Sequence, residues 1–102
     1  MKIQWTKAAR DNLVDISDYI ALRSPASASR FISEILERTS ILLTAPLAFR
    51  MVPELAQNDI REIIFGNYRI VYRITDGAIH ILTVFEGHKL LDMDVNNDSS
   101  QK

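Results

Sequence analysis

Three runs of strand-forming residues follow one another in the second half of the chain, and they constrain the fold more than any other feature. They span residues 60–65, 68–75 and 78–86, and only Gly66-Asn67 and Asp76-Gly77 separate them. Two-residue separators of this kind are typical of tight β-hairpin turns. The pattern therefore predicts a three-stranded antiparallel meander.

The middle run has two chemically different faces, because successive side chains of a strand point to opposite sides of a sheet. One face is apolar and the other is partly basic: Tyr68, Ile70, Tyr72 and Ile74 alternate with Arg69, Val71 and Arg73. We expect the apolar face to pack against helices from the first half of the chain.

Two helices are predicted ahead of the meander. A short strand at 2–5 precedes Thr6, whose hydroxyl is a suitable N-cap, and apolar residues then recur every three to four positions up to about Leu22. A second start signal is Ser24-Pro25, a capping hydroxyl followed by proline at the first helical position. That helix should end near 44–46. Because only a few residues join the helices, they must form an antiparallel αα-hairpin.

These elements together predict an α+β fold in one domain. A chain of 102 residues, 47% of them hydrophobic, can close one core. We expect a short N-terminal strand, the αα-hairpin, an irregular connection over 47–59 with one helical turn, and the β-meander. We place the domain at 1–95 and expect 96–102, which is polar and unpatterned, to be a disordered tail.

Composition excludes several classes of protein. The chain has no cysteine, so it has neither disulfides nor thiolate metal ligands. Its start lacks the apolar run of a signal peptide, and no segment approaches the roughly 20 apolar residues that span a bilayer. We therefore expect a soluble, cytoplasmic protein. A net charge of −1 argues against a strongly basic nucleic-acid-binding domain.

The basic residues of the meander are the main candidates for function. Arg69 and Arg73 lie on one strand face, roughly 13 Å apart at about 3.3 Å per residue, a spacing suited to an extended anionic partner. A plainer interpretation places both on the solvated side of a half-buried antiparallel sheet. His88-Lys89 either add positive charge to this face or lie in an exposed loop.

No cofactor or metal site is predicted. Glu86 and His88 are close in sequence but have no third ligand at a recognisable spacing. There is no Gly-rich phosphate loop, and no arrangement of Ser, His and Asp suggests a catalytic triad. His80 lies in the middle of a predicted strand, where we interpret it as a packed residue with one hydrogen bond.

A series of short motifs runs along the chain up to about Leu91: Trp5-Thr6, Ala9, Leu13, Ile16, Tyr19-Ile20, Pro25, Ala28, Leu43, Pro46, Ile60-Arg61-Glu62, residues 68–74 and residues 81–84. In this order and spacing they resemble the RelE/ParE superfamily of toxins from bacterial toxin–antitoxin modules. The two long N-terminal helices and the Ile-Arg-Glu strand resemble the ParE branch more closely than the RelE branch.

The resemblance implies a toxin that a cognate antitoxin neutralises by wrapping it with an extended or helical segment. Members similar to ParE bind DNA gyrase without being hydrolases, whereas members similar to RelE cut messenger RNA on the ribosome. Gyrase inhibition is therefore the leading hypothesis. A third alternative is a relative that binds its antitoxin without being toxic. Relatives often form toxin dimers or larger complexes with antitoxin, so either assembly is consistent with the resemblance.

The resemblance also suggests which residues meet the antitoxin or the target: Arg50, Arg61, Arg69, Arg73, His88, Lys89 and Leu90. Arg61 belongs to this set if it shares the face of the other two strand arginines. The nuclease alternative would use Arg69, His88 and Lys89, because RNA cleavage needs a base, an acid and charge stabilisation at the phosphate. Against it, residues 61–64 lack the lysines that RelE-like enzymes carry there, and no tyrosine follows Glu86.

Deletion of the polar tail tests the domain boundary. Removing residues 96–102 should leave the midpoint of thermal unfolding unchanged, because a tail without apolar residues contributes no buried surface. Circular dichroism of the full-length and shortened chains measures this. A large loss of thermal stability in the shortened chain would contradict the boundary at residue 95.

Overall fold

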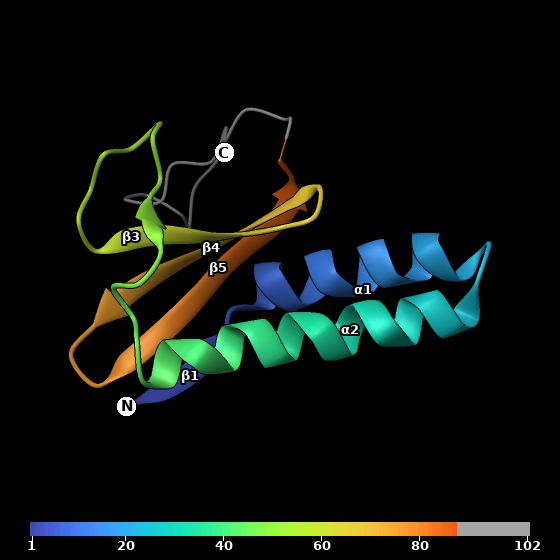
Figure 1. Cartoon of the computed structure of the whole chain (residues 1–102), viewed down its shortest axis with the longest axis horizontal. Helices are drawn as coiled ribbons and strands as arrows, with labels where there is room; N and C mark the ends of the chain where they lie inside the picture. Colours follow the sequence, from blue (N-terminus) through green and yellow to red (C-terminus); the bar gives the residue numbers. More distant parts are fainter. Residues whose placement is uncertain (88–102) are drawn as a thin grey trace.

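Two layers make up residues 1–87, the part of the chain that the computed structural model describes. Within it, one layer is a five-stranded sheet, and two helices cover one face of that sheet (Figure 1). The elements in chain order are β1 (Lys2–Trp5), α1 (Lys7–Ala21), α2 (Pro25–Ser40), a 3₁₀ turn (Ile41–Leu43), β2 (Arg50–Met51), β3 (Ile60–Phe65), β4 (Tyr68–Thr75) and β5 (Ala78–Glu86). The predicted α+β fold is confirmed, and β2 is an addition to it.

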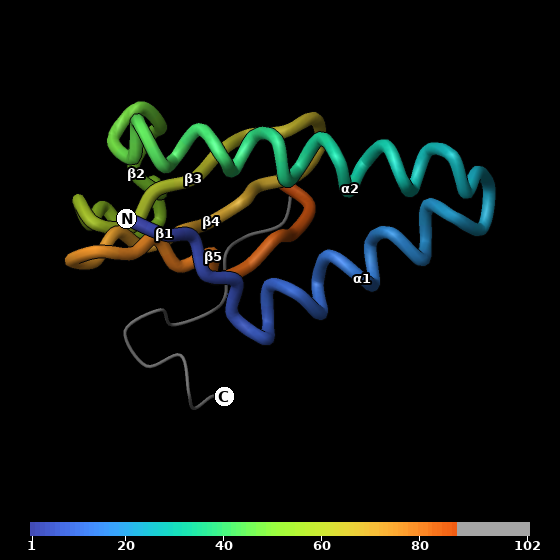
Figure 2. The backbone as a smooth tube through the Cα atoms, turned by 90° about the horizontal axis from the view of Figure 1, so that it is seen from below, coloured from blue at the N-terminus to red at the C-terminus, as the bar shows by residue number. Residues whose placement is uncertain are grey.

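Both helices begin where the sequence predicts. The Thr6 hydroxyl accepts a hydrogen bond from the backbone N–H of Ala9 at 3.1 Å, and the Ser24 hydroxyl accepts one from Ser27 at the same distance. These two caps satisfy N–H groups that the first turn of a helix leaves without a partner. The helices lie side by side as the predicted hairpin, and their connection lies beyond the end of the sheet (Figures 1 and 2).

The strands are ordered β1-β5-β4-β3-β2 across the sheet. The antiparallel pairing of β3, β4 and β5 confirms the predicted meander. β1 pairs in parallel with β5, from Lys2 opposite Ala78 to Trp5 opposite Ile81. The first strand of the chain is thus joined to the last strand of the described part, and the helical hairpin is the connection that returns the chain to the sheet.

The apolar face of β4 packs against the helices, as predicted. Ile70 and Tyr72 are fully buried in a cluster with Ala9 of α1 and Ile35 of α2. The Tyr68 ring lies 5.2 Å from the Phe31 ring of α2, measured between ring centroids. A cluster that unites both helices with three central strands makes the two layers one cooperative unit.

The opposite face of the sheet is not the solvated surface that the plainer interpretation assumed. A second, smaller cluster covers it, formed by Val52, Ile60, Val71 and Leu82 with Leu55 and Phe85 at its margin. Val52 and Leu55 come from the connection between β2 and β3, which folds back over the sheet. Only 6% of Arg69 is exposed as a result. The sequence did not predict that the connection covers this face, because the connection shows no regular apolar period.

Tyr72 links the core to the segment between the 3₁₀ turn and β2. Its ring is fully buried, and its hydroxyl donates a hydrogen bond of 2.7 Å to the carbonyl oxygen of Pro46. Burial raises the pKa of Tyr72 to about 12, with a smaller opposing effect from the positive charge of Arg61. Burial raises the pKa because the phenolate form would lose its hydration.

Replacing Tyr72 by Phe tests this role. At neutral pH the Tyr72→Phe variant should lose about 1 kcal/mol of unfolding free energy, because a carbonyl oxygen is left without its donor. Between pH 10 and about 12 the unfolded chain releases the Tyr72 proton while the folded chain keeps it. The unfolding free energy of the native protein therefore falls relative to that of Tyr72→Phe as the pH rises through this range. Urea unfolding across this range measures the difference.

Tyr19 provides the matched control, because 70% of this residue is exposed. The Tyr19→Phe variant should have the same unfolding free energy as the native protein at neutral pH. If Tyr72→Phe and Tyr19→Phe behaved alike, the Tyr72 hydroxyl would have no structural role.

Candidate binding surface

Arg69 is the most strongly held charged residue of the sheet. Its Nε donates to one oxygen of Glu62 at 2.6 Å, and its Nη1 and Nη2 donate to the two oxygens of Glu54, each at 2.7 Å. The guanidinium also lies over the Phe85 ring, 5.2 Å from its centroid. The paired Glu54 contact is the bidentate arrangement that makes arginine–carboxylate bonds strong.

Glu62 connects Arg69 to a second arginine. The Glu62 side chain is fully buried, and its other oxygen accepts a bond from Arg50 Nε at 2.5 Å. Two guanidiniums and two carboxylates therefore form one balanced set, which we call the buried ion network: Arg50, Glu54, Glu62 and Arg69. Pairing of this kind is what allows charges to remain in a low-dielectric interior.

The network fixes the protonation state of Arg69. The hydrogen bonds that Arg69 donates to Glu54 raise the pKa of Arg69 above its ordinary value, burial opposes this rise, and the contacts with Glu62 raise the pKa further. The side chain is thus permanently charged, and three of its N–H groups are committed to carboxylates. A guanidinium bound in this way has little capacity left to stabilise a phosphate.

A tight turn in the connection presents Glu54 to Arg69. The backbone N–H groups of Leu55 and Ala56 both donate to the Val52 carbonyl oxygen, at 3.1 and 2.9 Å, and close the single turn that the sequence predicts in this connection. Ala56 then has a φ of 52°, a left-handed conformation that ends the turn. Val52 itself is anchored to β3 through a bond from its N–H to the Ile60 carbonyl oxygen.

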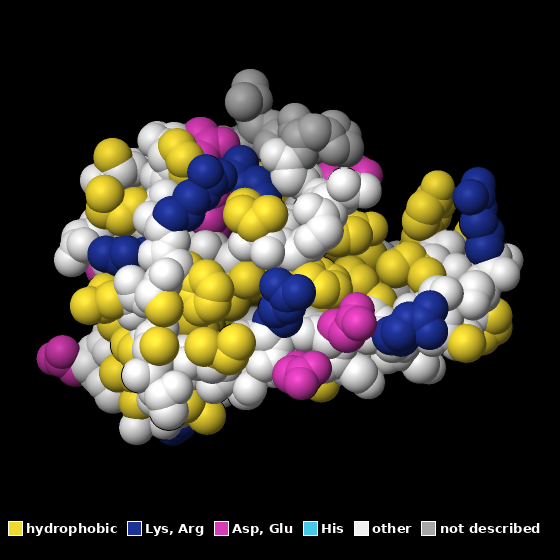
Figure 3. Space-filling view, in the orientation of Figure 1, with side chains coloured by type: hydrophobic (Ala, Val, Ile, Leu, Met, Phe, Trp, Pro, Cys, Tyr) yellow, Lys and Arg dark blue, Asp and Glu magenta, His cyan; other side chains and the backbone are white. Residues whose placement is uncertain are grey.

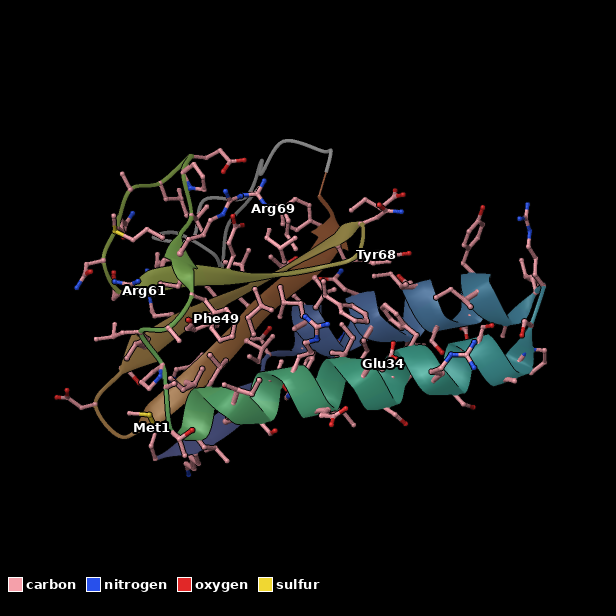
Figure 4. The ribbon with its side chains drawn as sticks, in the orientation of Figure 1. Met1, Glu34, Phe49, Arg61, Tyr68 and Arg69 are labelled. Carbon is pink, nitrogen blue, oxygen red and sulfur yellow. The ribbon has the colours of Figure 1, made fainter. Side chains whose placement is uncertain are left out.

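Arg61 does not share the face of Arg69. It pairs with Tyr72 across the β3–β4 ladder, and β4 presents Tyr72 on its helix-facing side. The Arg61 guanidinium donates to the carbonyl oxygens of Phe49 and Asn58 and to the Asn58 side chain, at 2.7 to 3.0 Å. Figure 4 shows Arg61 and Arg69 at separate places on the sheet. Because Arg61 lies on the other face, it does not join Arg69 and Arg73 in the predicted binding surface.

Arg73 lies on the Arg69 face but apart from the buried ion network. Its Nε lies 3.5 Å from a carboxylate oxygen of Asp59, and a quarter of its side chain is exposed. The remaining predicted residues, His88, Lys89 and Leu90, lie outside the described part of the chain. Of the predicted set, the structure brings together Arg50 and Arg69.

A groove of about 270 Å³ lies beside this pair of arginines. Its walls come from β2, β3, the turn between β3 and β4, the start of β4 and the residue after β5: Arg50, Ile64, Gly66, Asn67, Tyr68, Arg69 and Gly87. Two of these residues are open to solvent: 56% of the Arg50 side chain and 47% of Ile64 are exposed. Figure 3 shows Lys and Arg side chains gathered next to hydrophobic ones over this part of the sheet. The groove thus combines one accessible cation with an apolar wall.

The absence of a side chain at Gly87 leaves room for the Arg69 side chain and the Asn67 carbonyl. A Cβ at this position would lie 3.2 Å from Cγ of Arg69 and 3.3 Å from the carbonyl oxygen of Asn67. The same carbonyl oxygen accepts a hydrogen bond from the Gly87 N–H. Any larger residue would therefore press on the arginine that anchors the buried ion network.

A family model described as "ParE toxin of type II toxin-antitoxin system, parDE" matches residues 3–91. The match runs from β1 to beyond β5 and so includes both layers and the groove. The chain belongs to the ParE toxin family. The expected resemblance to the RelE/ParE superfamily is confirmed, with membership on the favoured branch.

A solved structure agrees with membership of the ParE family. The chain is similar to a protein of the chromosomal ParDE toxin–antitoxin system from P. aeruginosa, with a TM-score of 0.70 and 22% sequence identity. The similarity covers 84% of this chain and 95% of the other. At this identity the likeness shows that the fold is shared. No curated protein has a sequence that matches this chain.

Sequence reasoning missed the acidic half of this ParE chain's network. Glu62 lies between two isoleucines on alternate positions of a strand that is otherwise apolar on that face, and a carboxylate at such a position needs a buried partner. That pattern is a usable signal for Glu62. Glu54 has no comparable signal, because its place opposite Arg69 depends on how the connection folds.

A second hollow, of about 280 Å³, lies between α1 and the sheet and was not predicted. Asp15, Ile16 and Tyr19 of α1 line it together with Tyr68 and Glu86. Burial, Glu86 and Tyr19, in decreasing order of effect, raise the pKa of Tyr68. Figure 4 shows Tyr68 at the end of the sheet, on the side nearest the helical hairpin.

Among residues 1–87, no group of three or more His, Cys, Asp and Glu residues is placed to hold a metal ion.

Substitution of Glu62 tests the energetic role of the buried ion network. The Glu62→Gln variant should lose about 3 kcal/mol of unfolding free energy, because the buried Arg69 then keeps only Glu54 as a carboxylate partner and Arg50 loses its bond to Glu62. Chemical denaturation measures the loss. The matched control is Asp11→Asn, which removes a carboxylate from an exposed pair with Lys7 at 2.8 Å and should cost less than about 0.5 kcal/mol. Equal losses for the two variants would contradict a special role for Glu62.

Proposed function

We propose that this ParE family member stops bacterial growth by binding DNA gyrase and that a cognate antitoxin neutralises it. The observation that carries the proposal is the state of Arg69. The guanidinium that the nuclease alternative needs at a phosphate is buried and bound to Glu54 and Glu62. Because the N–H groups of this arginine already bond to carboxylates, the protein is better suited to binding a protein surface than to cleaving RNA.

The accessible part of the groove supports a protein partner. Arg50 and Ile64 offer a cation and an apolar side chain side by side, a combination that protein segments with carboxylates and aliphatic residues complement. We place contacts with antitoxin or gyrase at Arg50 and Arg73 and at the C-terminal residues His88, Lys89 and Leu90. Arg69 contributes by holding the walls of the groove in place.

The proposed site of action is the cytoplasm, where gyrase and a newly made antitoxin meet. None of the helices in residues 1–87 has the length and apolar character needed to cross a membrane. The active form is proposed to be the free toxin or its homodimer, and the inactive form a hetero-oligomer with antitoxin.

A gyrase assay tests this function. Purified antitoxin-free protein that arrests growth should inhibit supercoiling of plasmid DNA by gyrase or trap cleavage complexes, and added antitoxin should reverse the effect. Gel electrophoresis of the plasmid measures both. If growth stopped while gyrase remained unaffected, the ribosome-dependent cleavage of messenger RNA would replace this proposal. If expression without antitoxin did not slow growth, the chain would be a non-toxic relative.

A pair of arginine variants links the assay to the groove. Arg50→Gln should weaken gyrase inhibition, because it removes the exposed cation of the groove. Arg30→Gln is the matched control on α2, where the exposed Arg30 bonds to the Ser27 hydroxyl at 3.2 Å. Equal inhibition by both variants would move the gyrase contact away from the groove.

A further inference from the structure

The hollow between α1 and the sheet is bordered by two tyrosines and two carboxylates, and we call it the acidic hollow. Asp15, Ile16 and Tyr19 form its α1 wall, because Tyr19 lies three and four positions after the other two and so shares their side of the helix. Tyr68 and Glu86 form the opposite wall and are paired across the β4–β5 ladder. Apart from Tyr68, none of these residues lines the groove beside the buried ion network.

Asn12 fixes the α1 wall against the sheet. Its side-chain oxygen accepts hydrogen bonds from the Thr83 hydroxyl at 2.8 Å and from the Val84 N–H at 3.1 Å. Asn12 lies about one helical turn before Asp15 on α1, so these bonds act next to the hollow. The two walls are therefore held in place without a ligand, which lowers the entropic cost of binding one.

The acidic hollow has negative charge and no cation on its described walls. Its ionisable acids are Asp15 and Glu86, and none of the described residues that line it or the adjoining space of about 210 Å³ is Lys, Arg or His. Within residues 1–87, Asp15 makes no ion pair. The charge of Glu86 is felt across the hollow, since it helps to raise the pKa of Tyr68. These walls complement a cation.

The tyrosine rings and the size of the hollow favour one kind of cation. Because 70% of Tyr19 is exposed, its ring is open to a ligand. A guanidinium is planar, stacks on aromatic faces and bonds to a carboxylate through two N–H groups, whereas an ammonium is a compact and strongly hydrated charge. The volume of about 280 Å³ lies below the range typical of drug-sized ligands, so the hollow suits a single side chain.

We propose that the acidic hollow binds the guanidinium of an arginine side chain that a partner protein presents. The guanidinium bonds to the Asp15 carboxylate and lies against the rings of Tyr19 and Tyr68. Ile16 contacts the methylene groups of the arginine, which pack along apolar surface while the charged end stays polar. This site is separate from the proposed function, and its test needs neither gyrase nor antitoxin.

Titration of the full-length protein with Nα-acetyl-arginine N-methylamide, followed by NMR at constant ionic strength, tests the site. The ring signals of Tyr19 and Tyr68 should shift in a saturable way. A dissociation constant in the millimolar range is expected, because a single side chain makes only a few contacts. The neutral analogue Nα-acetyl-citrulline N-methylamide has nearly the same shape and should bind about ten-fold more weakly, because it lacks the charge.

Two carboxylate variants locate the bound guanidinium. Asp15→Asn should weaken binding of the arginine compound about ten-fold, because a charged acceptor becomes neutral. Asp18→Asn is the matched control and should bind like the native protein, since Asp18 is exposed on the same helix but does not line the hollow. Because Asp15 is exposed as well, circular dichroism should show the native fold in both variants.

A third variant tests the contribution of the aromatic wall. Tyr19→Leu keeps an apolar side chain at an exposed position but removes the ring. It should weaken binding of the arginine compound about three-fold, as expected for an exposed cation–π contact. Binding that did not change in this variant would remove Tyr19 from the site.

Four results would overturn the inference. Equal binding of the arginine and citrulline compounds would show that the hollow does not select a charge. Equal affinity of Asp15→Asn and Asp18→Asn would place the guanidinium elsewhere, and a lack of saturable shifts at Tyr19 and Tyr68 would show that the hollow takes no arginine. Ring signals that shift with protein concentration alone would replace the partner protein by a second copy of this chain. A negative gyrase assay, in contrast, would leave this site unaffected.

Discussion

The pairing of Arg69 with Glu62 and Glu54 is the constraint on which the rest of the structure depends. A guanidinium on the inner strand of a sheet can be covered only if its charge is met, because an unpaired buried ion costs several kcal/mol. Glu62 meets it from the neighbouring strand and Glu54 from the connection. Once these contacts form, the connection lies over the sheet and encloses the second apolar cluster.

This arrangement divides the sheet into two unequal faces. The helices cover one face with a large apolar core, while a short connection covers the other and stops before the end of β3. Beside the last pair of the β2–β3 ladder lies the groove lined by Arg50 and Ile64. A buried arginine therefore borders an accessible groove in a chain that belongs to the ParE toxin family.

The fold was largely predictable, and the site was only partly so. Local signals placed the strands and the helix starts: alternating residues between Gly66-Asn67 and Asp76-Gly77, and the caps at Thr6 and Ser24. The site depends on contacts between residues far apart in sequence. The sequence singled out Arg50 and Arg69, but it did not reveal that Glu54 and Glu62 hold them, and it left open the face of Arg61.

By itself, the sequence determined the two helix starts, the strands β1, β3, β4 and β5, the hairpin turns and the apolar face of β4. These properties follow from periodicity, capping and turn chemistry, each of which acts over a few residues. Only the tertiary structure decided that Arg69 is buried, that Arg61 lies on the helix-facing side of the sheet and that Ile64 lines a groove with Arg50. Those outcomes depend on strand register and on the path of an irregular connection, which bring together residues that no local pattern relates.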